Sequence, residues 1–254
     1  MSAVETIDVG NGITRLVLRS GRGNPVTPQF VTDINQTLDE LIKSPPRALI
    51  LDADGAKIFS GGFALPIIAD WSRNDIREFL GNFIKILHKL LRFPAPTIAV
   101  LEGHAIAGGF ILSLACDFRI AMPSRAKFGL SEVDLGAAVP AGAQVLLSAR
   151  TSEQISLKLC CTGELFSAER GEKLGYIDEL VDNPASRAVE LATTLASKPG
   201  QGVAISRQIF GEDISNRMQT ADEKHMDAFL DSWFSPEAQQ GIQKLASKLR
   251  ASKK

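Results

Sequence analysis

Two glycine-rich segments contain the residue types that could turn backbone N–H groups toward a ligand. Residues 58–66 read Ile-Phe-Ser-Gly-Gly-Phe-Ala-Leu-Pro, and residues 105–111 read Ala-Ile-Ala-Gly-Gly-Phe-Ile. In each, a β-type run leads through small residues into a helix-like stretch, and glycine permits the unusual dihedrals and close approach of such turns. Two turns at the ends of neighbouring strands could each donate one N–H to an oxygen that becomes negative during a reaction. Ordinary tight turns and close helix–sheet packing are the alternative interpretation.

A third segment, residues 127–136, supplies a candidate acid/base. It reads Lys-Phe-Gly-Leu-Ser-Glu-Val-Asp-Leu-Gly and places Glu132 and Asp134 in a largely uncharged stretch. A carboxylate beside an oxyanion-binding turn could remove a proton from a carbonyl compound. Most acidic side chains are solvated, so a surface position is the competing interpretation when this segment is considered alone.

Cysteine and histidine usage supports neither a disulfide framework nor a metal site. The cysteines are Cys116, Cys160 and Cys161, and the histidines are His88, His104 and His225. Three cysteines are too few for a framework of bridges, and a bridge between the adjacent pair would be strained. The histidine spacing matches no zinc motif, so we expect no metal.

Composition favours a folded enzyme over a disordered chain, a nucleic-acid binder or a membrane protein. The 254 residues are 44% hydrophobic and 22% charged, with a formal net charge of -1. This balance lacks the basic excess of a nucleic-acid binder, so we expect neither nucleic acid nor an anionic membrane as a partner. No apolar run reaches the roughly 18 residues of a membrane span, and the first residues lack a basic and apolar leader. We therefore expect a cytoplasmic location.

The first two-thirds of the chain alternates β-type and helical patterns, which predicts an α/β fold. The expected strands cover residues 13–18, 48–53, 97–101 and 118–121. Helices are expected over residues 28–42, which Thr27 can cap, and over residues 76–91, which end before two closely spaced prolines. Crossover segments of this length favour parallel strand pairing.

From about residue 152 onward the chain reads as almost entirely helical. Ser167 can cap a short helix that ends at Gly175, and Pro184 can begin another that ends before Pro199. A last amphipathic stretch needs an apolar partner surface, either in the same chain or in a neighbouring subunit. Its apolar residues are Met218, Ala221, Met226, Phe229, Leu230 and Trp233.

Taken in this order, the three segments resemble the enoyl-CoA hydratase/isomerase family, also called the crotonase superfamily. Residues 159–181 are similar to that family's LTG…SAEEA…LGLVDEVV stretch, and Lys198-Pro is similar to its later K-P motif. Residues 234–242 are similar to its F-x-S-x-E-x-x-E-G-I-type tail. Together with the three segments, these stretches make six motifs in the family's order that cover nearly the whole chain, which makes the resemblance specific.

The resemblance implies a crotonase-like spiral of ββα units over residues 1–195 and a helical C-terminal trimerisation region over residues 196–254. It also implies assembly as a homotrimer or a dimer of trimers, and an acyl-CoA thioester as substrate. Coenzyme A is then part of the substrate, bound near residues 19–24 and 59–63, and no separate cofactor is needed.

Residue roles follow from the same resemblance, position by position. The implied oxyanion donors are the backbone N–H groups of Phe63 and Gly108, and the implied acid/base is Glu132. Further implied substrate-binding residues are Ser60, Gly61, Gly62, Ala64, Leu65 and Ile111.

One departure from the family pattern narrows the expected reaction. Family hydratases typically use two glutamates, one in a G-G-x-E turn and one where Glu132 stands; Ile111 occupies the first position here. Hydration shares its proton transfers between two carboxylates, whereas moving a double bond from C3–C4 to C2–C3 needs one base that returns its proton at C4. Ile111 would also exclude water and raise the pKa of Glu132. The family's Δ3,Δ2-enoyl-CoA isomerases resemble this pattern, so conversion of 3-enoyl-CoA to 2-enoyl-CoA is expected.

A second departure keeps alternatives open. Ala64 stands where the family usually has an aspartate that supports the first oxyanion turn. The alternatives are an enoyl-CoA hydratase or another crotonase-family lyase or hydrolase, with Asp134 or His104 as a helper, and a catalytically weak acyl-CoA-binding scaffold. The acyl group stays undetermined; candidate wall residues are Phe63, Trp71, Phe79 and Phe110.

Overall fold

A six-stranded sheet runs through the centre of the chain in the order β1-β2-β3-β5-β7-β9. The computed structural model describes residues 2–123, 126–199 and 201–251. The strands are β1 (Val4–Asp8), β2 (Ile13–Leu18), β3 (Ala48–Asp52), β5 (Thr97–Leu101), β7 (Phe118–Ala121) and β9 (Glu179–Leu180). β1 pairs antiparallel with β2, and every other pairing in this sheet is parallel. All four strands expected from the sequence are present, and the parallel pairing between them is confirmed.

A second, three-stranded sheet lies beside the first and was not expected as a separate layer. Its strands are β4 (Ile58–Ser60), β6 (His104–Ile106) and β8 (Phe128–Gly129), in the order β4-β6-β8 and all parallel. Each follows a strand of the large sheet, so β3–β4, β5–β6 and β7–β8 are successive strand pairs, each followed by helix. This repetition confirms the spiral of ββα units.

Helices of the first part have caps that explain their limits. They are α1 (Pro28–Lys43), α2 (Leu65–Ile68), α3 (Arg73–Leu91), α4 (Gly108–Leu114), the 3-10 helix η1 (Glu132–Leu135) and α5 (Ala141–Arg150). Thr27 Oγ1 accepts a hydrogen bond from Phe30 N at 3.0 Å, as expected for α1. α3 begins earlier than predicted, at Arg73, because Ser72 and Asp75 form a reciprocal capping box.

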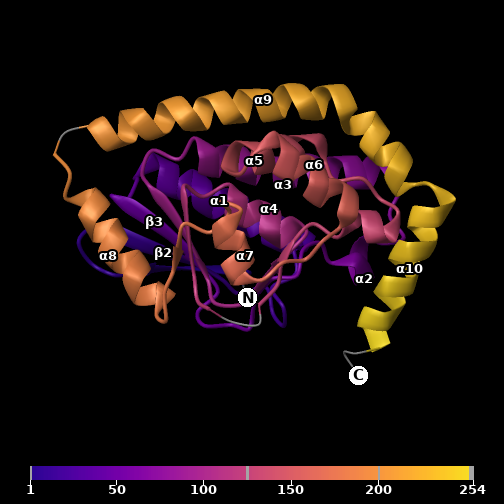
Figure 1. Cartoon of the computed structure of the whole chain (residues 1–254), viewed down its shortest axis with the longest axis horizontal. Coiled ribbons are helices and arrows are strands. Elements are labelled where there is room, and N and C mark those ends of the chain that lie inside the picture. Colours follow the sequence, from indigo (N-terminus) through magenta and orange to yellow (C-terminus); the bar gives the residue numbers. More distant parts are fainter. Residues whose placement is uncertain (1, 124–125, 200, 252–254) are drawn as a thin grey trace.

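The last part of the chain supplies α6 (Glu153–Thr162), α7 (Ala168–Lys173), α8 (Pro184–Ala196), α9 (Gly202–Trp233) and α10 (Pro236–Ala251). α8 packs on one face of the large sheet, against β2, β3, β5 and β7. On the other side of the molecule, α9 crosses over α5 and α3, and α10 descends beside α2 (Figure 1). Helix dominates this part as predicted, and the two residues of β9 interrupt it.

The amphipathic stretch of α9 finds its apolar partner in its own chain. Met218, Leu230 and Trp233 are buried, and α9 packs on α3 and α5. The side chain of Arg207 anchors the first half of α9 by donating to the Asp117 carboxylate and to the carbonyl oxygens of Phe93 and Leu90. The proposed division after residue 195 lies at the end of α8, and it stays a prediction.

We predict opposite effects of two glycine-to-alanine substitutions in long helices. A Cβ at Gly211 of α9 would overlap the carbonyl oxygen of Leu91, whereas a Cβ at Gly81 of α3 would meet open space. Gly211→Ala should therefore lower the free energy of unfolding by about 1–3 kcal/mol. Gly81→Ala should raise it by about 0.5–1 kcal/mol, because alanine favours helix. Urea denaturation checks both, and a stabilised Gly211→Ala would contradict the packing of α9 on the end of α3.

Candidate active site

Parallel pairing in the small sheet brings three chain segments to one edge. Phe63 lies three residues after the end of β4, Gly108 two residues after β6, and Glu132 three residues after β8. Because β4, β6 and β8 are neighbours and parallel, their carboxyl ends face the same way, which is where α/β proteins usually build binding sites. The three glycine- and carboxylate-bearing segments singled out in the sequence therefore meet at this edge.

The turns after β4 and β6 are in direct contact because the residues at the contact, Gly62 and Gly109, have no side chains. Gly62 has a positive φ of +81°, and a Cβ there would lie 3.0 Å from the backbone nitrogen of Gly108. A Cβ at Gly109 would overlap the carbonyl oxygen of Ser60 and lie 2.6 Å from Ser60 Cβ. Alanine at either position would push the two turns apart. Close packing, the alternative interpretation of these glycines, is therefore present in the structure.

The same turns leave two backbone donors unused by the protein. Within the described residues, neither Phe63 N nor Gly108 N donates a hydrogen bond to another protein group. The backbone groups on either side of Phe63 do bond to Val26, through Gly62 O at 2.8 Å and Ala64 N at 3.0 Å. Gly108 is the first residue of α4, where the N–H has no partner inside the helix.

Ala107 orients the second donor at a cost in backbone energy. It is a non-glycine residue with φ 51° and ψ -125°, a region that side chains rarely adopt. Its carbonyl oxygen accepts from Ile111 N at 3.0 Å, and its own N–H donates to Gly129 O at 2.9 Å, which holds the turn against β8. The strain is therefore maintained by contacts on both sides of the turn.

Glu132 is a half-buried residue whose carboxylate is shielded from water. It begins η1, and its Oε2 is inaccessible and has no hydrogen-bond partner among the described residues. Burial raises the pKa of Glu132 to about 7, although backbone N–H groups of Glu132 and Ser131 act in the opposite direction. A carboxylate with a pKa near neutrality can both accept and return a proton at physiological pH.

Two neighbours of Glu132 were not found from the sequence. Cys160 of α6 is buried; burial raises its pKa to about 11, with the charge of Glu132 contributing in the same direction. α10 packs against η1 and α2, and a Cβ at Gly241 would lie 2.6 Å from Leu135 O. The end of the same chain thus covers the element that carries Glu132. The small residues at positions 238 and 241 were the available signal.

The predicted substrate-binding residues of the first turn hold the residue 19–24 loop in place. Ser60 Oγ donates to Asn24 O at 2.7 Å, and Gly61 N donates to Gly23 O at 3.0 Å. The two segments implied to bind coenzyme A are therefore adjacent in space. Contact with a ligand stays a prediction for Ser60, Gly61 and Gly62.

Ala64, Leu65 and Ile111 are buried apolar residues that flank the two turns. Ala64 is the N-cap of α2 and gives that helix no side-chain cap, so the role usually filled by an aspartate is not filled here. Ile111 lies one turn into α4 and is 2% exposed. Ile111 brings no acid or base to the site.

The two candidate helper groups have other surroundings. His104 Nδ1 accepts from the backbone N–H of Lys127 at 3.0 Å, a structural contact between β6 and the segment before β8. Asp134 is exposed, and its Oδ1 would lie 2.9 Å from a Cβ built on Gly163. Neither contact favours a role beside Glu132.

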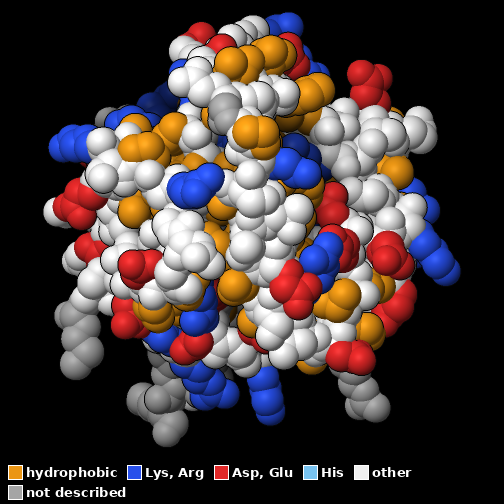
Figure 2. Space-filling view, turned by 90° about the vertical axis from the view of Figure 1, so that its left-hand side faces the viewer, with side chains coloured by type: hydrophobic (Ala, Val, Ile, Leu, Met, Phe, Trp, Pro, Cys, Tyr) orange, Lys and Arg blue, Asp and Glu red, His pale blue; other side chains and the backbone are white. Residues whose placement is uncertain are grey.

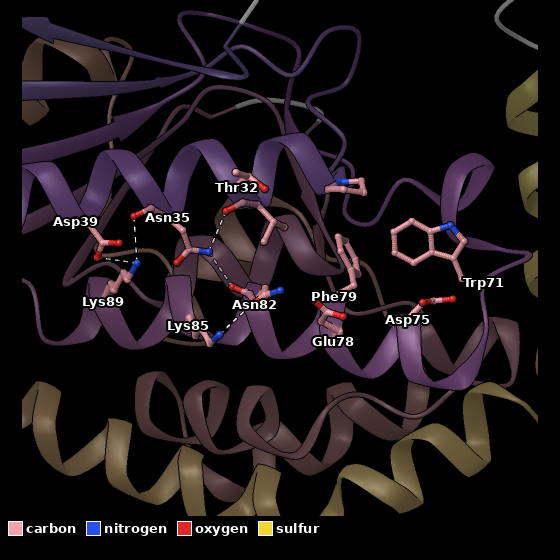
Figure 3. Close-up of a pocket in the computed structure, with 12 residues that line it drawn as sticks. Thr32, Asn35, Asp39, Trp71, Asp75, Glu78, Phe79, Asn82, Lys85 and Lys89 are labelled. Carbon is pink, nitrogen blue, oxygen red and sulfur yellow. Dashed lines mark hydrogen bonds and ion pairs between the residues drawn. The ribbon is translucent and has the colours of Figure 1, made fainter.

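A large groove between α1 and α3 does not include Glu132, Phe63 or Gly108 in its lining, although its lining residue Phe79 packs on the Phe63 ring with 5.1 Å between ring centroids. Its volume is about 860 Å³, and Trp71, Phe79 and polar side chains of α1 and α3 line it. Most of those polar groups bond to one another: Lys89 pairs with Asp39, and the Asn35 amide nitrogen donates to carbonyl oxygens of both helices (Figure 3). Two of the expected wall residues, Trp71 and Phe79, thus line this groove.

Within the described parts of the chain, no group of three or more His, Cys, Asp or Glu side chains is placed to hold a metal ion. The helices of residues 2–123, 126–199 and 201–251 include none that is long and apolar enough to cross a membrane.

The raised pKa of Glu132 predicts a pH-dependent stability difference. A carboxyl group that binds its proton more tightly when folded lowers the free energy of unfolding as pH rises from about 4.5 to about 7. Glu132→Gln removes this titration, so the variant should be more stable than the wild type by about 1–3 kcal/mol at pH 8, and similar at pH 4.5. Urea denaturation of both proteins measures the difference. An equal difference at both pH values would show that Glu132 has the same pKa in the folded and the unfolded protein.

The comparison with known families covers almost the whole chain. Residues 8–253 match the family described as enoyl-CoA hydratase/isomerase. A putative enoyl-CoA hydratase of Thermus thermophilus is 31% identical over 196 residues, 75% of each chain. The enoyl-CoA isomerase/hydratase fer4 of Mycosarcoma maydis is 32% identical over 197 residues, 74% of this chain and 71% of that one.

Solved structures show the same fold. The human mitochondrial delta3-delta2-enoyl-CoA isomerase superposes with a TM-score of 0.91 at 20% identity, covering 99% of this chain and 100% of that one. An enoyl-CoA hydratase/isomerase from Mycobacterium paratuberculosis gives a TM-score of 0.87 at 17% identity, covering 96% and 98%. The chain belongs to the enoyl-CoA hydratase/isomerase family.

Proposed function

We propose that this protein isomerises 3-enoyl-CoA to 2-enoyl-CoA with Glu132 as its single acid/base. The observation that carries the proposal is the shielded Glu132 carboxylate at the sheet edge where two turns leave the N–H groups of Phe63 and Gly108 unused. Family membership supports an acyl-CoA substrate, since the family is described by reactions of enoyl-CoA. Hydratases and isomerases both occur among its relatives, so the choice between them rests on the site.

The proposed reaction moves one proton and creates no net charge. The thioester oxygen accepts hydrogen bonds from Phe63 N and Gly108 N, and Glu132 removes a proton from C2. The electrons of the broken C–H bond form the C1–C2 double bond of a dienolate, whose negative oxygen the two N–H groups stabilise. Protonated Glu132 then gives its proton to C4. The C3–C4 electrons form the new C–H bond, the C1–C2 electrons form the C2–C3 double bond of the product, and the thioester carbonyl is restored. A resident cofactor or metal has no part in this sequence.

Ile111 explains why the double bond should move without addition of water. Hydration needs a positioned water and usually a second carboxylate, and the buried Ile111 side chain supplies neither. We propose that Ile111 also faces the bound substrate and keeps water from the site, in line with the burial that raises the pKa of Glu132. Substrate contacts by Ser60, Gly61, Gly62, Ala64 and Leu65 belong to the same proposal.

We also propose that the protein assembles as a homotrimer or a dimer of trimers. Its support is an apolar surface on the first half of α9, where Ile205 and Ile209, which do not line any cavity described below, are 50% and 63% exposed. Exposed apolar side chains grouped on one helix are typical of an interaction surface. A location in the cytoplasm stays a prediction.

A direct assay separates isomerisation from its alternatives. Purified protein is incubated with a 3-enoyl-CoA and, separately, with a 2-enoyl-CoA, and conjugation of the double bond and formation of 3-hydroxyacyl-CoA are followed. We expect conjugation of the first and little hydration of the second. Glu132→Gln should lower kcat for conjugation by about 10²–10⁴-fold, because the proton shuttle is lost.

The exposed carboxylate of Glu153 provides a matched control, and Glu153→Gln should retain wild-type kcat. Rapid hydration of 2-enoyl-CoA would favour the hydratase alternative. Binding of the thioester without any turnover would favour a scaffold, for which the uncapped Ala64 turn gives a structural reason. An unchanged conjugation rate in Glu132→Gln would exclude Glu132 as the base.

The reaction should depend on pH through the same carboxyl group. Glu132 must be ionised to accept the C2 proton, so kcat/KM should rise with pH and level off above the pKa of about 7. Below that pKa the rate should fall about tenfold per pH unit. Initial rates with 3-enoyl-CoA between pH 5 and pH 9 test this, and a flat profile down to pH 5 would contradict the assignment.

A further inference from the structure

A second cavity lies between the first half of α9 and the body of the protein, away from the sheet edge that carries Glu132. Its volume is about 410 Å³, within the range of small-molecule pockets. Figure 2 shows this end of the molecule, with hydrophobic side chains gathered at the top over the first turns of α9. The apolar lining residues are Pro96, Phe118, Leu195, Val203, Phe210 and Ile214.

The positive and negative charges at the polar side of this cavity do not balance. Arg207 and Asp117, which both line the cavity, form an ion pair, and Arg119 pairs with Asp178 at 2.7 Å outside the lining. Arg150 is the fifth charged group, and the electrostatic interactions that shift its pKa include both aspartates and Arg119. Three guanidinium groups thus share two carboxylates. One positive charge is left without a matching negative charge among these residues.

Arg150 lines the cavity and is the residue left unmatched. Its Nε donates to Leu114 O at 3.0 Å, which fixes the position of the guanidinium group. Among the described residues, its two terminal nitrogens donate no hydrogen bond, and no ion pair includes it. Burial, with the charge of Arg119, lowers the pKa of Arg150 to about 10, so the group stays charged at neutral pH.

A cation whose donors find no protein acceptor needs an anion or water to meet them. The planar fork of a guanidinium group matches the two oxygens of a carboxylate. The apolar walls beside it match a hydrocarbon group.

We propose that this cavity binds a small monocarboxylate with an apolar tail, such as a short or medium-chain fatty acid, with its carboxylate on Arg150 and its tail against Phe118, Leu195 and Val203. A single negative charge balances the single unmatched positive charge. A phosphate dianion would bring more charge than the cluster lacks and no apolar surface for the walls. The proposal is independent of the reaction at Glu132.

Calorimetric titration of the full-length protein with sodium octanoate tests the site. We expect one octanoate per chain with a dissociation constant below about 1 mM. Octanamide, which has the same tail but no charge, should bind at least tenfold more weakly. Equal affinities for octanoate and octanamide would overturn the proposal. An absence of octanoate binding would also overturn it, whether the cavity is empty or is filled by a second copy of the chain.

Variants locate the bound octanoate. Arg150→Met should weaken octanoate binding at least tenfold, whereas Arg217→Met, on the exposed side of α9, should leave it unchanged. Val203→Trp adds bulk to the apolar wall while keeping all the charged side chains, and it should abolish binding even if Arg150→Met fails to fold. Wild-type affinity in either Arg150→Met or Val203→Trp would overturn the proposal.

Glu132→Gln distinguishes this cavity from the catalytic edge. Octanoate affinity should be unchanged in that variant because the carboxylate is expected at Arg150. A tenfold change would place octanoate beside Glu132 and overturn the second site, whatever the isomerase assay shows.

Discussion

The contact between two turns at Gly62 and Gly109, which have no side chains, is the constraint on which the proposed catalytic edge depends. Parallel pairing of β4 and β6 brings the turns to one edge, and the missing Cβ atoms at Gly62 and Gly109 allow their backbones to meet. The same arrangement leaves the N–H groups of Phe63 and Gly108 without protein acceptors. Close packing and free backbone donors, which the sequence presents as competing explanations for the glycines, are therefore two results of one geometry.

The proposed acid/base group depends on a second constraint, which lowers the stability of the fold. Keeping the Glu132 carboxylate away from water raises its pKa to about 7, and the chain receives no compensating hydrogen bond at Oε2 from the described residues. Strain at Ala107 is a further local cost. Such costs are tolerated when well-packed elements hold the strained residues, and they are common at functional sites. Burial and strain at one edge are thus consistent with a site shaped for chemistry.

Part of this structure follows from sequence patterns, and part depends on packing that patterns do not contain. β2, β5 and α1 were predicted because their apolar periodicity extends over several residues and their ends carry caps or prolines. β4, β6 and β8 have two or three residues each, which is too short for a periodic signal. Glu132 was chosen from the family resemblance, and the burial that raises its pKa became visible only with the elements around it in place.

The long helix α9 makes the last part of the chain inseparable from the site. Its 32 residues span about 48 Å, so its anchor at Arg207 and its end at Trp233 lie far apart on the molecule. The buried face between them packs on α3 and α5, which fixes where the chain turns into α10. α10 then rests on η1 and α2, the elements that follow β8 and β4. The position of Glu132 is therefore determined by helix packing at the end of the chain as well as by strand pairing in its first half.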